Sequence, residues 1–184
     1  MTAITQCLEK NEVQDFVLAG EINEKTTKEC VDWILKENAN NEFSHLNLYI
    51  NSGGGEVCSG FSVVNIMKQS KLPVYTYGIG RIMSCGLIIF MAGHRGKRFL
   101  NKNTRILSHQ LSSEVWGSLS DLKDSLKECE YVQKTIRDHY MDCLNIKDRK
   151  EKLRIINEVL LIDNDVYLTP QQLMKYGGAD RVVK

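Results

Sequence analysis

The chain has 184 residues, with 24 Lys and Arg against 23 Asp and Glu, so its formal net charge is +1. This length predicts a single domain over residues 1–184, because domains commonly have about 100–200 residues. Hydrophobic residues make up 42% and charged residues 26%, which is typical of a globular protein and excludes an intrinsically disordered chain. The near-neutral charge, with no long Lys/Arg run, argues against a nucleic-acid partner.

The composition also argues against a membrane or secreted protein. The longest apolar stretch, residues 87–92, is far shorter than the roughly 20 residues that span a bilayer. The acidic N-terminal region, with Glu9, Glu12 and Asp15, lacks the apolar segment of a secretory signal. The six cysteines form no CxxC pair and no cluster with zinc spacing, so we expect no metal site, no cofactor and reduced thiols in the cytoplasm.

Strands and helices alternate along the first 110 residues. Strands are predicted at 16–19, 46–50, 74–78, 98–100 and 105–108, and helices at 25–38, 57–69 and 84–92. Asn23 is the expected cap of the first helix. Residues 51–55 and 78–80 contain glycines and are expected to form turns. This alternation predicts an α/β fold of stacked βαβ units with parallel strands.

A long helix is predicted over residues 118–145. Ser118 opens a capping box, and apolar residues follow at spacings of three and four: Leu119, Leu122, Leu126, Cys129, Val132, Ile136, Tyr140 and Cys143. At 1.5 Å per residue the helix is about 40 Å long, about the width of the whole domain. We therefore expect it to project and pack against another subunit; the alternative is a helix lying along the surface. Thr169 and Pro170 then begin a short helix that ends before Gly177.

Ser84 is the first residue with the chemistry of a nucleophile. It is predicted at the start of the apolar helix 84–92, where unpaired N–H groups and the helix dipole stabilise an oxyanion. The same position is also favoured by a serine that only caps the helix.

His109 is the candidate general base. Of the four histidines, His45 and His94 are expected in surface turns and His139 on the long helix, whereas His109 ends a strand that looks buried. Histidine is the side chain best suited to proton transfer near neutral pH. A purely structural histidine would fit the position equally well.

Two further features could complete a catalytic site. Residues 51–55, Asn-Ser-Gly-Gly-Gly, follow a strand and precede a helix, where glycines let a ligand or another backbone approach closely; a plain tight turn would look similar. Asp163 and Asp165 lie in a loop before Tyr167, and either carboxylate could orient a histidine. Neither a nucleotide-binding glycine motif nor a GxSxG nucleophile elbow is present.

Together these segments resemble the proteolytic subunit of the Clp protease. The matching pieces are residues 48–55, 83–86, 92–99, 105–110, 165–169 and 176–180, in shared order and spacing. The resemblance implies a crotonase-like fold, with the 118–145 helix as the projecting handle that joins two rings. It also implies an ATP-dependent serine endopeptidase that cuts unfolded polypeptides inside a barrel of two stacked heptameric rings, fed by a Clp-type AAA+ unfoldase.

The resemblance assigns a role to each candidate residue. Ser84 maps to the nucleophile, His109 to the general base and Asp165, rather than Asp163, to the orienting carboxylate. The oxyanion-hole amides map to Gly54 and Cys85. The residues expected to bind substrate are Gly55, Leu111, Ser112 and Ser113.

Several positions depart from the family pattern. Gly53 replaces a proline, and Ile82 and Met83 replace small residues before the nucleophile. Residues 111–114 replace a Pro-x-Gly-Gly strand that pairs with substrate, and Asn164 replaces an arginine used between rings. The segment 1–14 is also shorter than the family's axial loops that engage the ATPase.

Two alternatives stay open, and the departures favour the first of them. One is a structural or regulatory subunit that assembles with another Clp-type ring without cutting peptides. The other is a crotonase-type acyl-CoA enzyme, which would share the fold and the oxyanion-hole logic.

Overall fold

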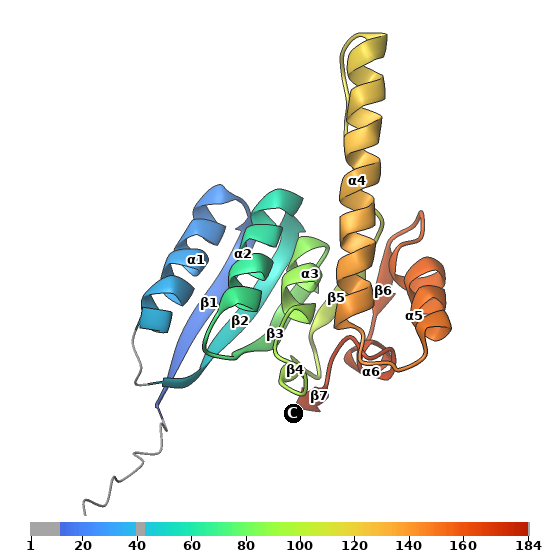
Figure 1. Ribbon diagram of the computed structural model, residues 1–184. Helices are drawn as coiled ribbons and strands as arrows, with labels where there is room; N and C mark the ends of the chain where they lie inside the picture. Colours follow the sequence, from blue (N-terminus) through green and yellow to red (C-terminus); the bar gives the residue numbers. More distant parts are fainter. Residues whose placement is uncertain (1–11, 40–42, 184) are drawn as a thin grey trace, which may run out of the picture.

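The computed structural model describes residues 12–39 and 43–183. Its first strand begins at Glu12, so most of the segment predicted over residues 1–14 lies outside the described residues. Strands and helices alternate up to residue 108, as predicted, and the α/β class is confirmed (Figure 1).

The described residues form one seven-stranded sheet and the helices packed against it. The strands are β1 (Glu12–Ile22), β2 (Phe43–Gly55), β3 (Val74–Met83), β4 (Arg98–Asn101), β5 (Arg105–Ser108), β6 (Val166–Leu168) and β7 (Arg181–Val183). The helices are α1 (Glu24–Ala39), α2 (Val57–Gln69), α3 (Cys85–Met91), α4 (Leu119–Cys143), α5 (Arg149–Ile155), the π-helix η1 (Ile156–Leu160) and α6 (Pro170–Lys175). The main sheet has the order β1-β2-β3-β4-β7 with parallel neighbours, and β5 pairs with β3.

The predicted helix caps are confirmed. The Asn23 Oδ1 atom accepts the Thr26 N–H at 3.1 Å. Ser118 and Thr169 each form a full capping box, in which side chain and backbone satisfy each other's free groups. The starts of three helices were therefore readable from local sequence.

The glycine segments 51–55 and 78–80, expected to be turns, belong instead to the ends of β2 and β3. Both strands continue irregularly, with a register shift between Ile50 and Ser52. A Cβ atom on Gly80, which has a φ of +65°, would lie 2.6 Å from the Asn51 Oδ1 atom. That oxygen accepts the Arg81 N–H at 3.2 Å, so the glycine permits a side chain to bridge the two strand ends.

One pairing departs from the all-parallel expectation. The short strand β6, which the sequence did not predict, runs antiparallel to β5, with Ser108 opposite Val166. This pairing draws the loop before β6 toward the end of β5, where His109 follows.

Helices α1, α2 and α3 cover one face of the sheet (Figure 1). The core between them consists of side chains such as Leu18, Leu48, Ile50 and Phe90, all almost completely buried. The α3 helix is buried along its whole length, as its apolar sequence predicted. Burial of apolar area at about 25 cal/mol per Å² makes this layer the main stabilising contribution in the fold.

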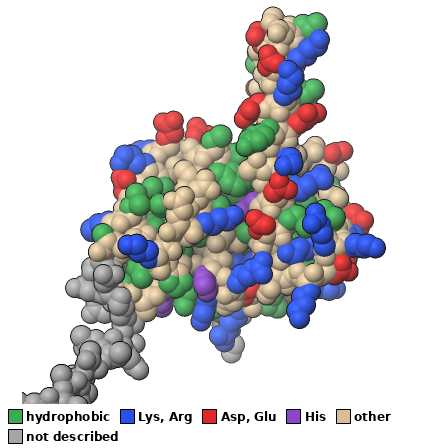
Figure 2. Space-filling view, in the orientation of Figure 1, with side chains coloured by type: hydrophobic (Ala, Val, Ile, Leu, Met, Phe, Trp, Pro, Cys, Tyr) green, Lys and Arg blue, Asp and Glu red, His purple; other side chains and the backbone are tan. Residues whose placement is uncertain are grey.

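The α4 helix projects from this body, which confirms the predicted projection and excludes a helix lying along the surface (Figures 1 and 2). Its 25 residues span about 37 Å. Exposure falls along one apolar stripe, from 70% at Leu119 to 4% at Ile136. Only the last two turns of α4 therefore belong to the core. No helix among the described residues is both long and apolar enough to cross a bilayer.

Three cationic side chains hold the C-terminal end of α4. The carbonyl oxygens of residues 141–143 accept hydrogen bonds from Lys152 Nζ, Arg95 Nη2 and Arg98 Nη1, at 2.6, 2.6 and 2.8 Å respectively. These carbonyls have no partner within the helix and carry the negative end of its dipole. We call this arrangement the root of α4.

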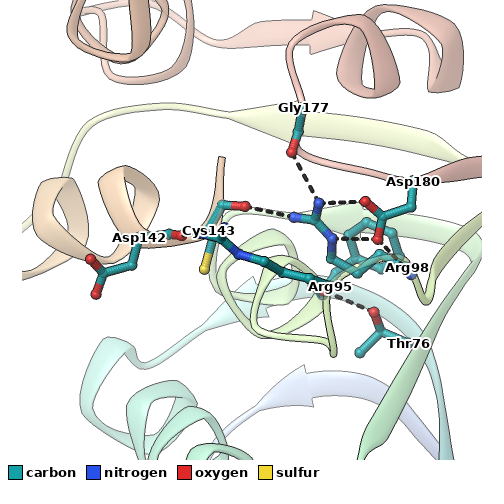
Figure 3. A network of polar contacts seen from close by, with 8 residues as sticks. Thr76, Arg95, Arg98, Asp142, Cys143, Gly177 and Asp180 are labelled. Carbon is teal, nitrogen blue, oxygen red and sulfur yellow. Dashed lines mark hydrogen bonds and ion pairs between the residues drawn. The ribbon is translucent and has the colours of Figure 1, made fainter. Parts of the chain in front are cut away.

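Arg98 is the centre of the root (Figure 3). Its side chain is 0% exposed, and it also donates to Gly177 O and to both carboxylate oxygens of Asp180. Burial opposes ionisation of Asp180, but the hydrogen bonds and charge of Arg98 outweigh it and hold the pKa of this carboxyl below its ordinary value. The pair thus ties β4 to α4 and to the C-terminal segment.

Substitution of Arg98 tests this tie. We expect Arg98→Met to lower the free energy of unfolding by about 3–5 kcal/mol, because it leaves the Asp180 charge buried without its partner. Arg154→Met, which breaks the exposed ion pair with Glu151, should lower the free energy of unfolding far less, because water already solvates both charges. Urea unfolding of both variants measures the difference, and equal losses would contradict the structural role of Arg98.

His139, near the C-terminal end of α4, is a second buried titratable group. The His139 Nε2 atom lies 2.9 Å from Ile88 O, and burial lowers the pKa of His139 to about 4. The hydrogen bond to Ile88 and the charge of Asp142 raise this pKa, while the charge of Lys68 lowers it further. His139 is therefore neutral in the folded protein at neutral pH.

This burial predicts a loss of stability on acidification. Between pH 6.5 and pH 4 the unfolded chain binds a proton at His139 that the folded chain does not, so stability falls as the pH falls through this window. By pH 4 this proton uptake by the unfolded chain lowers the free energy of unfolding by about 3 kcal/mol. Urea unfolding should show a weaker pH dependence in His139→Gln than in the unchanged chain, and identical profiles would refute the assignment.

Candidate active site

Ser84 is the single residue between β3 and α3. Its φ of 50° and ψ of −121° make it the one non-glycine residue with positive φ in the described ranges. Such a conformation costs roughly 1–3 kcal/mol and is found where a structure exposes a reactive side chain at a sharp strand-to-helix turn. The Ser84 side chain forms no capping hydrogen bond, so the alternative of a mere helix cap is not what the structure shows.

His109 contacts Ser84 directly. The Ser84 N–H donates to Leu107 O at 2.9 Å, which joins the end of β3 to β5. Two residues further on, the His109 Nε2 atom lies 2.9 Å from Ser84 Oγ. This is the distance of a hydrogen bond between a nucleophile and its general base.

The second ring nitrogen of His109 contacts the backbone. Its Nδ1 atom lies 2.5 Å from the carbonyl oxygen of Gln110. Because a carbonyl oxygen can only accept, this contact requires the proton on Nδ1 in the neutral imidazole. The lone pair of Nε2 then faces Ser84, which is the tautomer that a general base needs.

Neither candidate aspartate forms a hydrogen bond with His109. Asp163 and Asp165 are both exposed in the loop that precedes β6. The antiparallel register nevertheless pairs Ser108 with Val166, so continuing it by one residue sets His109 opposite Asp165. The backbone geometry therefore favours Asp165 over Asp163 as a partner, while the side chain of Asp165 stands apart.

The two predicted oxyanion donors differ in the structure. Among the described hydrogen bonds, the Cys85 N–H at the start of α3 has no acceptor, whereas the Gly54 N–H donates to Ser52 Oγ at 3.0 Å. The absence of a side chain at Gly54 makes room for Ser84, because a Cβ at position 54 would lie 2.7 Å from the Ser84 Cβ. The glycine that borders the space beside Ser84 is Gly55.

A cavity of about 140 Å³ opens beside Ser84 and His109. Three of the four residues expected to bind substrate line it: Gly55, Leu111 and Ser112. Ser113 instead lines a larger groove of about 870 Å³ between the segment that follows His109 and α4. The sequence did not single out two other lining residues, Ile136 and Tyr140, as site residues, because they occurred in the helical stripe as ordinary core positions.

Cys85 does not compete with Ser84 as a nucleophile. Burial raises the pKa of the Cys85 thiol to about 12, and its Sγ atom lies 3.3 Å from Glu56 O. The thiolate, which is the reactive form, is therefore absent near neutral pH. In the part of the chain that the structure describes, no group of three or more His, Cys, Asp or Glu residues is placed to hold a metal ion.

Comparisons with known proteins show which family this chain is similar to. The family model of the Clp protease matches residues 2–184. A Clp protease proteolytic subunit of Deinococcus radiodurans, described as ATP-dependent, is 30% identical over 162 residues, which cover 88% of this chain and 76% of the relative. A subunit with the same description from Thermobifida fusca is 29% identical over 166 residues, covering 90% and 78%. The match supports a peptidase with the crotonase-like fold and leaves the acyl-CoA alternative without support.

Proposed function

The chain belongs to the Clp protease family, and on that premise we propose that it is a serine endopeptidase acting on unfolded polypeptides. The observation that carries this proposal is the 2.9 Å contact between Ser84 Oγ and His109 Nε2, made from a strained residue at a strand-to-helix turn. These two groups supply the nucleophile and the base of acyl transfer.

The proposed reaction has two halves. The Ser84 oxygen attacks the carbonyl carbon of the scissile peptide bond, while His109 Nε2 takes the hydroxyl proton. The resulting imidazolium gives that proton to the leaving amine, and the C–N bond breaks to leave an acyl-enzyme. A water molecule, deprotonated by His109, then releases the acid product and restores the Ser84 hydroxyl.

The developing oxyanion needs donors that are in place before the reaction. The free Cys85 N–H at the start of α3 supports the role proposed for it. For the second donor, a contribution from Gly54 requires that its N–H release Ser52 Oγ, whereas Gly55 already borders the cavity.

Asp165 is proposed as the group that stabilises the imidazolium. The Gln110 carbonyl fixes the tautomer of His109 but carries no charge. The position opposite His109 in the β5–β6 register supports Asp165, and a rotation of its side chain toward Nδ1 is required for the complete triad.

We also propose that the subunit works in a barrel. The projecting half of α4 and the adjoining loop expose large apolar side chains, namely Trp116, Leu119, Leu122, Leu126 and Tyr131. Such a surface is costly in a monomer and is typical of an interface. By analogy with the family we propose two stacked heptameric rings in the cytoplasm, supplied by a Clp-type AAA+ unfoldase.

One observation favours a second candidate, a Clp-like subunit without activity. The Asp165 side chain is exposed and makes no hydrogen bond with His109. A chain that assembles without a charged partner for its histidine would serve as a structural member of a mixed ring.

Labelling with a fluorophosphonate separates the two candidates. We expect the probe to add to the unchanged protein, seen by intact mass, and not to Ser84→Ala, because only an activated serine oxygen attacks phosphorus. Ser62→Ala, an exposed serine on α2, is the matched control and should label normally. Absence of labelling in an assembled protein would favour the structural subunit.

Asp165→Asn tests the third group. Since Gln110 already holds the tautomer, we expect kcat/KM for a peptide to fall by about 10- to 100-fold, the difference between a charged and a neutral hydrogen-bond partner. Asp163→Asn should retain full activity. Peptide hydrolysis measures both, and an unchanged rate in Asp165→Asn would show that the backbone carbonyl alone is sufficient.

A further inference from the structure

Gln133, on α4, contacts the segment that follows His109. Its Oε1 atom accepts the Leu111 N–H at 2.8 Å. Because a backbone N–H can only donate, this contact requires the carbonyl end of the Gln133 amide to face Leu111. The Gln133 side chain is half-buried and lines, with Gln110 and Leu111, the groove of about 870 Å³ between this segment and α4. A side chain of the projecting helix therefore holds the backbone just beyond the candidate general base.

The peptide group between Gln110 and Leu111 joins this bond to the histidine. Among the described residues every peptide bond is trans, so the C=O and N–H of one peptide group lie in one plane and point in opposite directions. On one side, the Gln110 carbonyl oxygen lies 2.5 Å from His109 Nδ1. On the other side, the Leu111 N–H donates to Gln133. A rotation that turns the N–H away from Gln133 also turns the carbonyl away from His109.

Gln133 is also the last partner of this segment before α4 begins. The Gln110 N–H donates to Ile162 O at 3.4 Å, and the Leu111 N–H, held by Gln133, follows it. Among the hydrogen bonds of the described residues, none involves residues 112–117, which are mostly exposed. Gln133 therefore separates the peptide group that meets the histidine from a stretch whose backbone is held by no other part of the chain.

We propose that Gln133 is a positioning residue for His109. By holding the Leu111 N–H, it directs the Gln110 carbonyl at the Nδ1 atom of the histidine. The proton then stays on Nδ1, and Nε2 remains free to accept the Ser84 proton. This inference rests on the proposed peptidase function. Leu111 stands where the family pattern has a proline, which has no N–H, so the bond depends on this chain's own sequence.

The test compares two variants of the assembled, full-length protein. Gln133→Met removes the acceptor at similar side-chain length, whereas Gln133→Glu keeps an oxygen there. Hydrolysis of a fluorogenic peptide and the rate of fluorophosphonate labelling at Ser84 both need His109 as the base. We expect Gln133→Met to lower kcat/KM and the labelling rate about 3- to 10-fold, through kcat with KM nearly unchanged, and Gln133→Glu to retain at least about half of each rate. Lys134→Met, at the neighbouring exposed position, is the matched control and should change neither rate.

Leu111→Pro provides a second test, because proline removes the N–H that Gln133 holds. In a Leu111→Pro background, Gln133→Met should lower the labelling rate no further, since the two substitutions break the same bond. An additional 3- to 10-fold fall in this background would show that Gln133 acts through another contact and would overturn the inference.

The remaining outcomes are equally decisive. An unchanged labelling rate in Gln133→Met, or equal losses in Gln133→Met and Gln133→Glu, would overturn the inference while the peptidase assignment stands. A fall in the peptide rate alone, through KM, would assign Gln133 to substrate binding and overturn it as well. If Gln133→Met does not assemble, as judged by size-exclusion chromatography, Gln133→Ala, with the residue that most favours helix, should still lower the labelling rate. Absence of both cleavage and labelling in the unchanged protein would instead refute the proposed function.

Discussion

At the root of α4, Lys152, Arg95 and Arg98 donate hydrogen bonds to the final carbonyls of the projecting helix. A helix that stands clear of its domain has side-chain support only along its buried turns, so its direction is set at its base. Three cations meet the negative end of the helix dipole there, and Arg98 links them to Asp180 near the C-terminus. The same turns form one wall of the cavity beside Ser84, so the orientation of α4 and the shape of the candidate site have a common cause.

The strain at Ser84 is maintained by close backbone packing. Its positive φ places the Ser84 Cβ so near Gly54 that a side chain at position 54 would overlap it. Behind the turn, the buried α3 helix fixes the following residues, and the Ser84 N–H is held by Leu107 O. The glycines at the end of β2 therefore leave the space that the backbone turn at Ser84 requires.

The features predicted correctly from the sequence are those that depend on short stretches of chain. Alternation gave the α/β class, caps gave the helix starts at Asn23, Ser118 and Thr169, and the length of α4 gave its projection. The antiparallel strand β6 escaped prediction because three residues carry no periodicity, and its pairing with β5 is a tertiary event. The contact of Gln110 with His109 and the place of Ile136 in the cavity wall escaped prediction for a similar reason. Gln110 makes its contact through the backbone, and Ile136 has the pattern of an ordinary core residue.

The surroundings of His109 separate two requirements that a catalytic triad usually combines. The first requirement is that a particular ring nitrogen carries the proton, and a neutral acceptor such as the Gln110 carbonyl is enough to fix that tautomer. Stabilising the imidazolium needs negative charge, and the acids predicted for this role, Asp163 and Asp165, lie in the loop before β6. The β5–β6 pairing anchors that loop, and its register, continued by one residue, sets Asp165 opposite His109. The fold thus fixes the first requirement rigidly and leaves the second to an exposed side chain.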